Sequence, residues 1–505
     1  MINRKNLITT AFLILIFGLS VLLRMLFVKY GSILFSYDQA RDAFMAKEII
    51  AGDLKIMGPP ASILQGLSHG VIWYYLLAIF YSIGQGSPIV AAYSYGVVVS
   101  LSIFSIFLLS KTLSGNGKIG LVSALLWAVS FEGIQYSTWL SNPSLAFIFT
   151  PLIYLFLWLW IEKKKSIYAL AAGIFLGLSV QANLFLIYHL ISIAILLLIN
   201  RVKILSKHSL LFVVAFLVSI STLILEQIKF GFAGIKGVVF LLSGTDKFVS
   251  STGFGDFLIN YLNQIGTVFS NNLFPYNHAF GGLLGTIVVV LTIKKLIQDE
   301  KRHNWTLYIL VFMFSQIIIS MFGGMSTPYI GVGLGVAIII LTTNLIFSIK
   351  SSVVKILTIL FFVCIGISTV FTKADKSIFA IQEEMRIDIT QELIDYTYQE
   401  SNGEKFSINT VTAPLWVNTT WSYLYKWYGM EKYGYLPNFI GRDQIGQIDQ
   451  LGSGKPEKTI YLIIEPSIAI PQRYIDATIA EENARSKVLE EKNWKTLIVQ
   501  KRILK

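Results

Sequence analysis

Two aspartates and an arginine stand close together near the start of the chain, in the stretch YDQARD at positions 37–42. Asp38 and Asp42 are four residues apart, and Arg41 is three residues from Asp38, so on a helix their side chains are neighbours. Two carboxylates one turn apart raise each other's pKa, whereas a neighbouring guanidinium lowers the pKa of a carboxylate and holds it in place. Such a group can act as a general base.

The segment that carries this cluster has the signals of a short helix over 36–51. Ser36 with Gln39 is suited to a capping box, and Gly52 follows the last helical residue. A simpler interpretation is that Asp38 only favours the positive end of the helix dipole. That interpretation does not account for the concentration of acids, because four of the eleven carboxylates of the first 372 residues lie between positions 38 and 53.

The composition of the chain indicates where such a helix would lie. Hydrophobic residues make up 54% of the 505 residues and charged residues only 14%, which is too apolar for a protein that keeps its surface in water. Apolar runs of about 15 to 25 residues alternate with short polar breaks, as helices that cross a ~30 Å hydrocarbon core require. We therefore predict a polytopic α-helical membrane protein.

Basic clusters give the predicted orientation of the spans. Residues 1–372 carry 24 Lys and Arg against 11 Asp and Glu, whereas residues 373–505 carry 17 against 18. Basic loops on the cytoplasmic side account for this excess without a nucleic-acid partner. With Arg4 and Lys5 inside and the first apolar run retained as a signal anchor, the C-terminus lies outside. The eleven predicted spans lie near 7–28, 89–110, 120–138, 144–161, 167–181, 184–200, 209–225, 282–297, 305–322, 330–349 and 356–372.

This topology places two large loops, 29–88 and 226–281, on the outer face of a plasma membrane, which we expect to be bacterial or archaeal. The apolar stretch 70–84 is short and rich in Trp and Tyr, so it is expected to be a re-entrant or interfacial helix. Residues 373–505 have the composition of a water-soluble domain and are predicted to form a small extracytoplasmic α/β domain. Its expected strands are KFSINTV, KTIYLIIEP and WKTLIVQKRIL, and its expected helices are 376–399 and 473–492.

The order of motifs in the first outer loop resembles a known group of membrane enzymes. YDQARD is followed by AGDLKIMGPPAS and then by HGVIWYYLLAIF. This order is similar to that of GT-C membrane glycosyltransferases, in particular the family 39 type, which includes protein O-mannosyltransferases and lipid A aminoarabinose transferases. In that group an acidic motif, a Gly-Asp pair, a Pro-rich turn and an aromatic amphipathic helix follow the first span. The resemblance extends over roughly residues 1–165 and the overall topology.

The resemblance implies transfer of a sugar from a polyprenyl-phosphate donor to a hydroxyl of a lipid, protein or glycan at the outer membrane face. Asp38 then takes the role of catalytic base, and Asp53 matches the Gly-Asp pair. A direct displacement that uses a single base would invert the anomeric centre of the sugar. Gln39 stands where the group usually has Glu, which weakens the inference of a metal-binding acidic pair. A divalent metal cofactor stays open, although Cys364, the one cysteine, offers no cysteine-based site within a chain.

Further residues of the first outer loop are candidates for binding the substrates. A departing lipid phosphate needs cations, and the loop offers four residues that could supply them: Arg41, Lys47, Lys55 and His69. His69 stands directly before the interfacial stretch and would lie at headgroup depth. Tyr74 and Tyr75 are suited to packing on a sugar or a prenyl chain, although aromatic belts place tyrosines at membrane interfaces without any ligand.

The remaining candidates for substrate binding lie near the ends of later spans. They are Asn142, His189, Tyr276, Asn277, His278 and Tyr329. An Asn-Pro turn such as that of Asn142 needs no ligand. An ionisable residue within a span, such as His189, is functional by default unless nearby polar groups satisfy it. Tyr329 belongs to GGMSTPYIG, where relatives often carry a basic residue that this chain lacks.

Two other functions are left open by the sequence. A transporter, such as a flippase for lipid-linked sugars, would carry scattered charges in its spans and two related halves. Here Glu132 is the main carboxylate within a span, and the acidic cluster lies in a loop instead. A membrane-anchored binding protein would use the aromatic run TTWSYLYKWYG to stack on sugars, although packing on the domain core or the membrane is commoner. Neither alternative explains YDQARD, so the sequence favours an enzyme.

Overall fold

The computed structural model describes residues 4–61, 66–203, 205–242, 254–298, 304–317, 328–376, 382–444 and 451–505. The chain divides into two compact units. The helical unit comprises Met1–Phe27, Lys55–Trp73 and Tyr93–Lys373. The mixed unit joins Val28–Leu54 and Tyr74–Ala92 to Ala374–Lys505, so two parts of the predicted first outer loop belong with the C-terminal segment.

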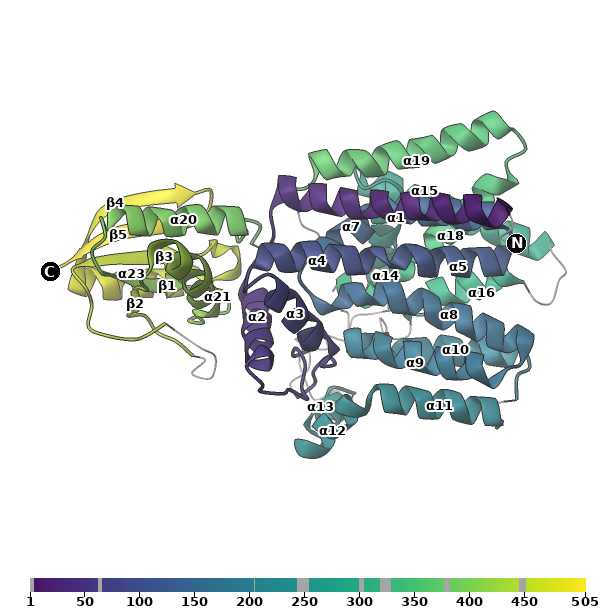
Figure 1. Ribbon diagram of the computed structural model, residues 1–505, viewed down its shortest axis with the longest axis horizontal. Coiled ribbons are helices and arrows are strands. Elements are labelled where there is room, and N and C mark those ends of the chain that lie inside the picture. Colours follow the sequence, from purple (N-terminus) through teal and green to yellow (C-terminus); the bar gives the residue numbers. More distant parts are fainter. Residues whose placement is uncertain are drawn as a thin grey trace. The chain divides into compact units, whose positions relative to one another are not determined.

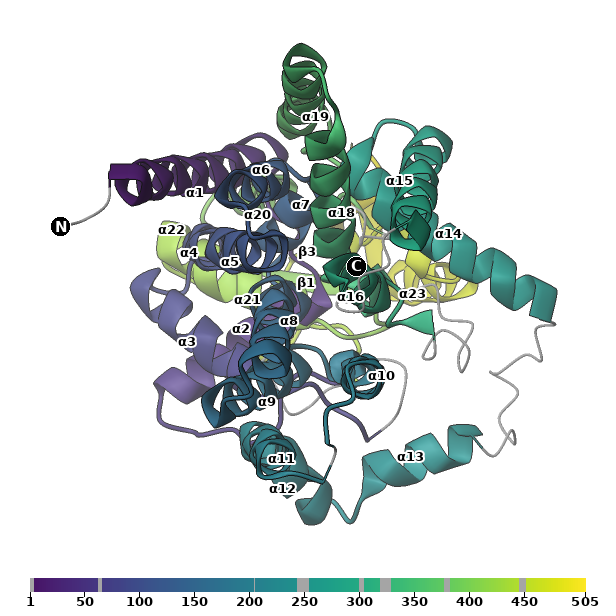
Figure 2. The same cartoon turned by 90° about the vertical axis from the view of Figure 1, so that its right-hand side faces the viewer.

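The helical unit is built from long apolar helices (Figures 1 and 2). Those that lie largely in it are α1 (Arg4–Gly31), α4 (Pro88–Ser100), α5 (Ser102–Ser114), α6 (Gly117–Ala128), α7 (Phe131–Thr138), α8 (Ala146–Lys163), α9 (Ser166–Ala182), α10 (His189–Ile199), α11 (Lys207–Ser219), α12 (Ser221–Lys229), α13 (Ala233–Leu242), α14 (Phe254–Leu273), α15 (His278–Gln298), α16 (Trp305–Met313), α18 (Leu334–Ser348) and α19 (Ser352–Thr372). Short 3-10 turns lie at η1 (Asn142–Leu145), η2 (Leu184–Tyr188) and η3 (Pro328–Gly331). Both views show α5, α8, α9 and α11 as one row of neighbouring helices.

The close packing of α9 against α11 depends on two glycines one turn apart. A Cβ at Gly173 would lie 2.3 Å from the carbonyl oxygen of Phe212, and one at Gly177 would lie 2.3 Å from the Cβ of Ser219. Two helices approach this closely in a membrane only where small residues face each other, since apolar side chains gain nothing by leaving lipid. The sequence GIFLG therefore determines that these two helices are neighbours.

By length and composition, five of the described helices are able to cross a membrane, or up to seven if two bent pairs each form one span. The bent pairs are α6 with α7, at 55°, and α11 with α12, at 59°. Shorter apolar helices, among them α9 and α18, coincide with other predicted spans. The fold class is thus confirmed as polytopic and helical with a small C-terminal sheet, whereas the count of eleven spans stays a prediction. Part of the predicted span 305–322 lies outside the described residues.

The C-terminal part of the mixed unit contains a five-stranded sheet. Its strands are β1 (Phe406–Val411), β2 (Asn438–Phe439), β3 (Thr459–Ile464), β4 (Ser486–Trp494) and β5 (Leu497–Leu504), in the order β2-β1-β3-β5-β4. β1 pairs in parallel with β2 and β3, whereas β5 is antiparallel to both β3 and β4. The helices of this unit are α2 (Tyr37–Ile50), most of α3 (Ile72–Ile83), α20 (Ile387–Glu400), α21 (Thr419–Leu424), which continues as a π-helical turn over Tyr425–Gly429, α22 (Met430–Tyr433) and α23 (Gln472–Arg485). The three predicted strands are confirmed as β1, β3 and β5.

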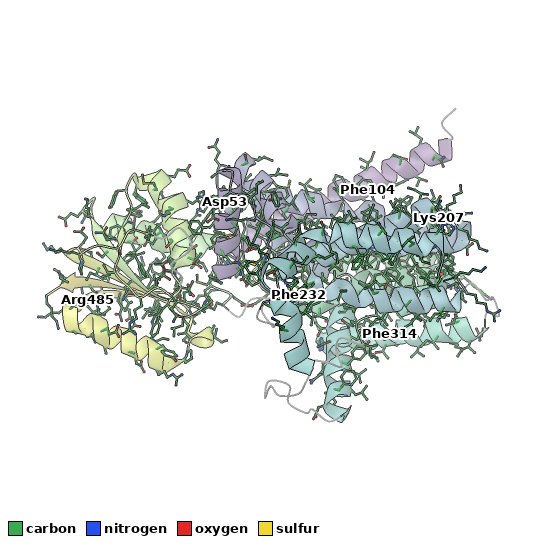
Figure 3. All side chains as sticks on the ribbon, turned by 90° about the horizontal axis from the view of Figure 1, so that it is seen from below. Asp53, Phe104, Lys207, Phe232, Phe314 and Arg485 are labelled. Atoms are coloured by element: carbon green, nitrogen blue, oxygen red, sulfur yellow. The ribbon has the colours of Figure 1, made fainter. Side chains whose placement is uncertain are left out.

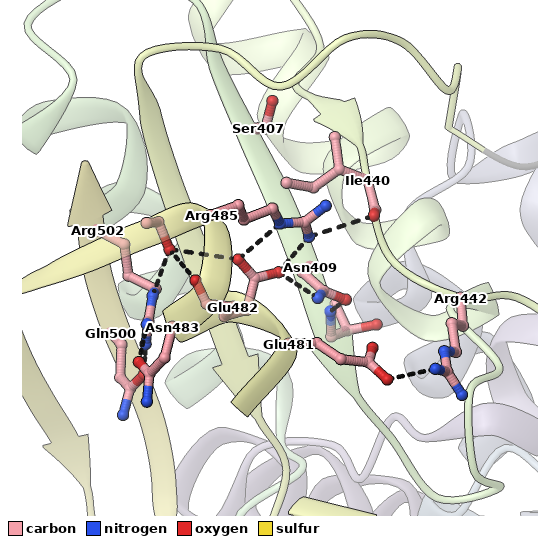
Figure 4. A network of polar contacts seen from close by, with 12 residues as sticks. Ser407, Asn409, Ile440, Arg442, Glu481, Glu482, Asn483, Arg485, Gln500 and Arg502 are labelled. Atoms are coloured by element: carbon pink, nitrogen blue, oxygen red, sulfur yellow. Dashed lines mark hydrogen bonds and ion pairs between the residues drawn. The ribbon is translucent and has the colours of Figure 1, made fainter. Parts of the chain in front are cut away.

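The predicted helix 473–492 is wrong in its last third. α23 ends at Arg485 and the chain continues directly as β4, which pairs with β5. The junction is held by a polar network in which Asn409 donates to the buried Glu482 at 2.5 Å and Arg485 donates to the same carboxylate (Figure 4). β4 is an exposed edge strand, so its charged residues follow a pattern that also suits a helix face. Residues 486–492 form a strand because they pair with β5, and the local sequence does not show this pairing.

A buried acid at the end of β3 makes the stability of the mixed unit depend on pH. Glu465 accepts hydrogen bonds from the amide of Ala413 at 2.8 Å and from Nε1 of Trp421 at 3.1 Å, but burial outweighs them and raises its pKa to about 7. Because the unfolded carboxyl ionises near its ordinary pKa of 4.5, the folded state loses about 3 kcal/mol as pH rises from about 4.5 to about 7. Protease resistance of this unit in the full-length protein should fall over that range, and much less so in Glu465→Gln. An equal fall in both proteins would contradict this assignment.

Candidate functional site

The three residues of the predicted catalytic cluster lie together on α2, as one ion-pair network. Nη1 of Arg41 donates to Oδ1 of Asp38 at 2.7 Å. The other edge of the guanidinium, Nε and Nη2, donates to Oδ1 of Asp42 at 2.9 and 2.7 Å. The ring of Tyr37 covers the guanidinium at 5.5 Å. One guanidinium therefore binds two carboxylates.

The two aspartates differ in exposure, which separates their chemical roles. The side chain of Asp38 is 56% exposed and that of Asp42 only 4%. Burial alone would lower the pKa of Arg41, but the charges of Asp42 and then Asp38 outweigh it and raise that pKa well above its usual value. The guanidinium thus stays charged. Asp42 is the buried anchor of the pair, and Asp38 is the carboxylate that an external molecule can reach.

Three other residues of the first outer loop that the sequence singled out have defined places in the mixed unit. Oε1 of Gln39 accepts from the amide and the hydroxyl of Ser36, at 3.2 and 2.9 Å, so it completes the predicted capping box and the helix prediction is confirmed. Nζ of Lys47 lies 4.6 Å from the ring centroid of Tyr423. Asp53 follows α2 on an exposed turn (Figure 3).

The two tyrosines of α3 differ in burial. Tyr74 is buried beside the acid cluster. It is close enough to form a hydrogen bond with Arg41 and to interact electrostatically with Asp42. Tyr75 is half-buried. The structure therefore brings Tyr74 to the network of α2.

In the helical unit, several predicted residues meet where α9 ends. Nδ1 of His69 accepts from the amide of Leu184 at 3.1 Å. Asn142 donates to the carbonyl of Ala182 at 2.5 Å. Asn183, which the sequence did not single out as a site residue, donates to the carbonyl of Tyr329 at 2.8 Å. Segments far apart in the chain thus converge on residues 181–185, the short break between two apolar helices.

His189 lies one turn further along, inside the bundle. Its ring is fully buried, and Nδ1 shares a hydrogen bond of 2.9 Å with the hydroxyl of Tyr154. Nε2 has no partner among the described residues. The neighbouring Tyr188 donates to the carbonyl of Ile330 at 3.1 Å. We use the name interior polar region for the buried polar side chains of this stretch, which are Gln181, Asn183, Tyr188 and His189.

The third predicted group lies elsewhere in the helical unit. The hydroxyl of Tyr276 bonds to Ser368 and Thr372 at the end of α19, at 2.8 and 2.5 Å. Oδ1 of Asn277 accepts from the amide of Phe280 and so caps α15, and His278 is exposed at the first position of that helix. These contacts are structural, and among the described residues none joins this group to the interior polar region.

Two charged residues within the apolar helices were not weighed as site residues. Arg24 is the one charged residue of the predicted span 7–28 and is buried, so its position in the sequence was a sufficient signal. It donates to the carbonyls of Ser20 at 3.0 Å and Gly133 at 3.1 Å, where the pair α6–α7 bends. Glu226 of α12 is buried beside Ser68, and one of its oxygens has no partner among the described residues.

Glu132, the carboxylate that a transporter would use, is held by its neighbours. Asn272 of α14 donates to it, and the hydroxyl of Ser130 donates to Asn272 at 2.7 Å. A Cβ on Gly335 of α18 would lie 2.6 Å from the carboxylate, so the helices close over it. Its contacts therefore belong to helix packing. Within the described part of the chain, no three His, Cys, Asp or Glu side chains group to hold a metal ion.

Comparisons with known proteins fit this arrangement. The chain resembles the crystal structure of ArnT from Cupriavidus metallidurans bound to undecaprenyl phosphate, with a TM-score of 0.62 over 97% of this chain and 98% of that one, at 10% sequence identity. That likeness shows a shared fold. The family model described as dolichyl-phosphate-mannose-protein mannosyltransferase matches residues 68–225. One segment of the chain thus matches a mannosyltransferase family model, and the chain as a whole has the fold of ArnT. A search of curated proteins found no significant match.

The family match covers some of the predicted site residues and not others. The family match covers His69, Asn142, His189 and the interior polar region, but it begins after α2. The catalytic assignment of the acid cluster on α2 is therefore argued from its geometry alone. What that geometry supplies is an exposed carboxylate held by an arginine that is itself fixed by a buried acid.

Proposed function

We propose that the protein is a GT-C membrane glycosyltransferase, which moves a sugar from a polyprenyl-phosphate donor to an acceptor hydroxyl at the outer face of a plasma membrane, with Asp38 as general base. One observation carries the proposal: the exposed carboxylate of Asp38 is bound at 2.7 Å by an arginine whose other edge is fixed by the buried Asp42. The orientation of the termini is part of the proposal, with the N-terminus cytoplasmic and the C-terminal domain outside. The undecaprenyl phosphate bound by the structurally similar ArnT supports a lipid-phosphate donor.

The reaction requires one base and a stabilised leaving group. As the acceptor oxygen forms a bond to the anomeric carbon, its proton passes to a carboxylate oxygen of Asp38. The bond between that carbon and the phosphate oxygen breaks, and its electron pair leaves with the polyprenyl phosphate. Attack opposite the leaving phosphate inverts the anomeric centre. Because Arg41 keeps its charge, its Nη1 holds the carboxylate of Asp38 in place before the proton arrives.

A binding role for the interior polar region is the second part of the proposal. His69, Asn142 and Tyr329 all approach residues 181–185, and His189 has one ring nitrogen without a partner among the described residues. Polar groups gathered inside an apolar bundle are costly unless they serve a ligand or one another. We assign them to the binding of a polar part of the donor or the acceptor. Tyr276, Asn277 and His278 stay proposals of lower rank, because their contacts already cap and join helices.

Donor turnover tests this function. Purified protein in bilayers would be supplied with a panel of radiolabelled polyprenyl-phosphate sugars and crude membrane acceptors, and the free lipid phosphate and the anomeric configuration of the product would be measured. We expect one donor to be consumed and the product to have the inverted configuration. Retention of configuration would rule out a single displacement. Labelled lipid that crosses the bilayer without being consumed would favour a transporter instead.

A further inference from the structure

One side chain of the C-terminal segment lies directly against the helix that carries the acid cluster. Tyr423 of α21 is fully buried. Its ring meets the ring of Phe44 on α2 edge-on at 5.1 Å, and Nζ of Lys47 lies 4.6 Å from its centroid. Its hydroxyl donates to the carbonyl of Gly86, just beyond α3, at 2.7 Å. All four residues belong to the mixed unit, so Tyr423 holds α2 and the end of α3 together.

The chain leading into α2 is held by the same segment through its backbone. The amide of Phe35 donates to the carbonyl of Met385 at 2.8 Å, and the amide of Ile387 donates to the carbonyl of Ile33 at 2.9 Å. The ring of Phe35 also lies 5.4 Å from that of Tyr423. The entry to α2 and the face of α2 are therefore fixed by two parts of the C-terminal segment.

A packed path leads from Tyr423 to the acid cluster. Tyr81 of α3 is buried, and its ring centroid lies 6.1 Å from that of Tyr423. Tyr81 is also close enough to Asp42 for an electrostatic interaction. Asp42 in turn fixes Arg41, which holds Asp38. Buried side chains in contact transmit displacement, because the interior is close-packed. A shift of Tyr423 would therefore reach the carboxylate that is proposed to act as base.

We propose that the C-terminal segment is part of the catalytic unit and that Tyr423 is a positioning residue, which sets the place of α2 and thereby of Asp38. This inference rests on the proposed function of Asp38 as base. Displacing a reacting group by about 1 Å can cost about a hundredfold in rate. Loss of the Tyr423 ring is therefore expected to lower kcat, whereas KM for the donor stays close to that of the wild type.

The chain offers a matched control on the same helical segment. Tyr425 is as fully buried as Tyr423, but its ring meets Tyr398 and its hydroxyl bonds to Thr397 at 3.0 Å, both within the C-terminal segment. Tyr423→Leu and Tyr425→Leu each remove one fully buried ring. Among the described residues, the contacts given for Tyr425 lie within the C-terminal segment, whereas those of Tyr423 reach α2. Tyr423→Phe keeps every ring contact and loses only the bond to Gly86, so it should restore kcat to near the wild-type value.

Two readouts on the full-length protein decide the question. Tyr423→Leu should lower kcat by roughly tenfold to a hundredfold and speed hydrogen exchange of the α2 amides, and Tyr425→Leu should do neither. Equal loss of kcat in both variants, or unchanged exchange in α2, would overturn the positioning role. The exchange measurement does not depend on activity. If Asp38→Asn proved fully active while α2 still loosened in Tyr423→Leu, the base assignment would fail and the contact would stand.

Discussion

Replacing Asp38 by Asn is expected to lower the rate of sugar transfer by roughly a hundredfold to ten-thousandfold, the usual contribution of a general base. Asn has the same shape and its carbonyl oxygen can still accept the hydrogen bond from Arg41, so the fold of α2 should persist. The amide has no basic oxygen to take the acceptor proton. The expected signature is a lower kcat with little change in KM for the donor, measured as release of free polyprenyl phosphate.

The control for this experiment is another acid of the same helix. Glu48→Gln removes one negative charge from the last turns of α2 and keeps Asp38, Arg41 and Asp42, so its kcat should stay near that of the wild type. If Asp38→Asn transferred sugar at the wild-type rate, Asp38 would not be the base. If both variants lost activity equally, the effect would belong to the net charge of the helix and not to Asp38.

Local signals in the sequence were enough to predict the element that carries the cluster. Ser36 and Gln39 lie three residues apart at the start of α2, and Gly52 follows its end, so the limits of α2 follow from signals next to each end. The neighbourhood of Asp38, Arg41 and Asp42 follows equally from helical spacing. The difference in exposure between the two aspartates does not, because it is set by α3, which packs beside α2 and brings Tyr74 to the network.

Contacts between distant segments account for what the sequence did not predict. Nothing near His69 indicates that it would meet Leu184, or that Asn183 would reach the backbone of Tyr329. The aromatic run 419–429 was expected to pack on a core or the membrane, and Tyr423 does pack, but its partners on α2 are hundreds of residues away in the chain. Such contacts require no particular periodicity or spacing in either segment, so they cannot be predicted from a local sequence pattern.

Arg41 should matter for stability as well as for catalysis. Arg41→Met leaves the buried carboxylate of Asp42 without the guanidinium that pairs with it, and breaking a buried pair in this way typically costs about 3 to 5 kcal/mol. We expect faster hydrogen exchange across α2 and a lower melting temperature of the full-length protein in detergent. Asp38 also loses its hydrogen bond from Arg41, so transfer should fall together with stability.

A double variant separates the two effects. In Arg41→Met with Asp42→Leu, apolar side chains replace the whole buried pair, which often restores stability because no uncompensated charge remains. Asp38 is still without the guanidinium that orients it, so stability should recover while kcat stays low. Recovery of both would mean that Arg41 serves the fold alone and that Asp38 orients itself. Recovery of neither would mean that the pair of Arg41 with Asp42 organises α2 in a way that apolar packing cannot replace, and the base would then depend on a buried charge for its position.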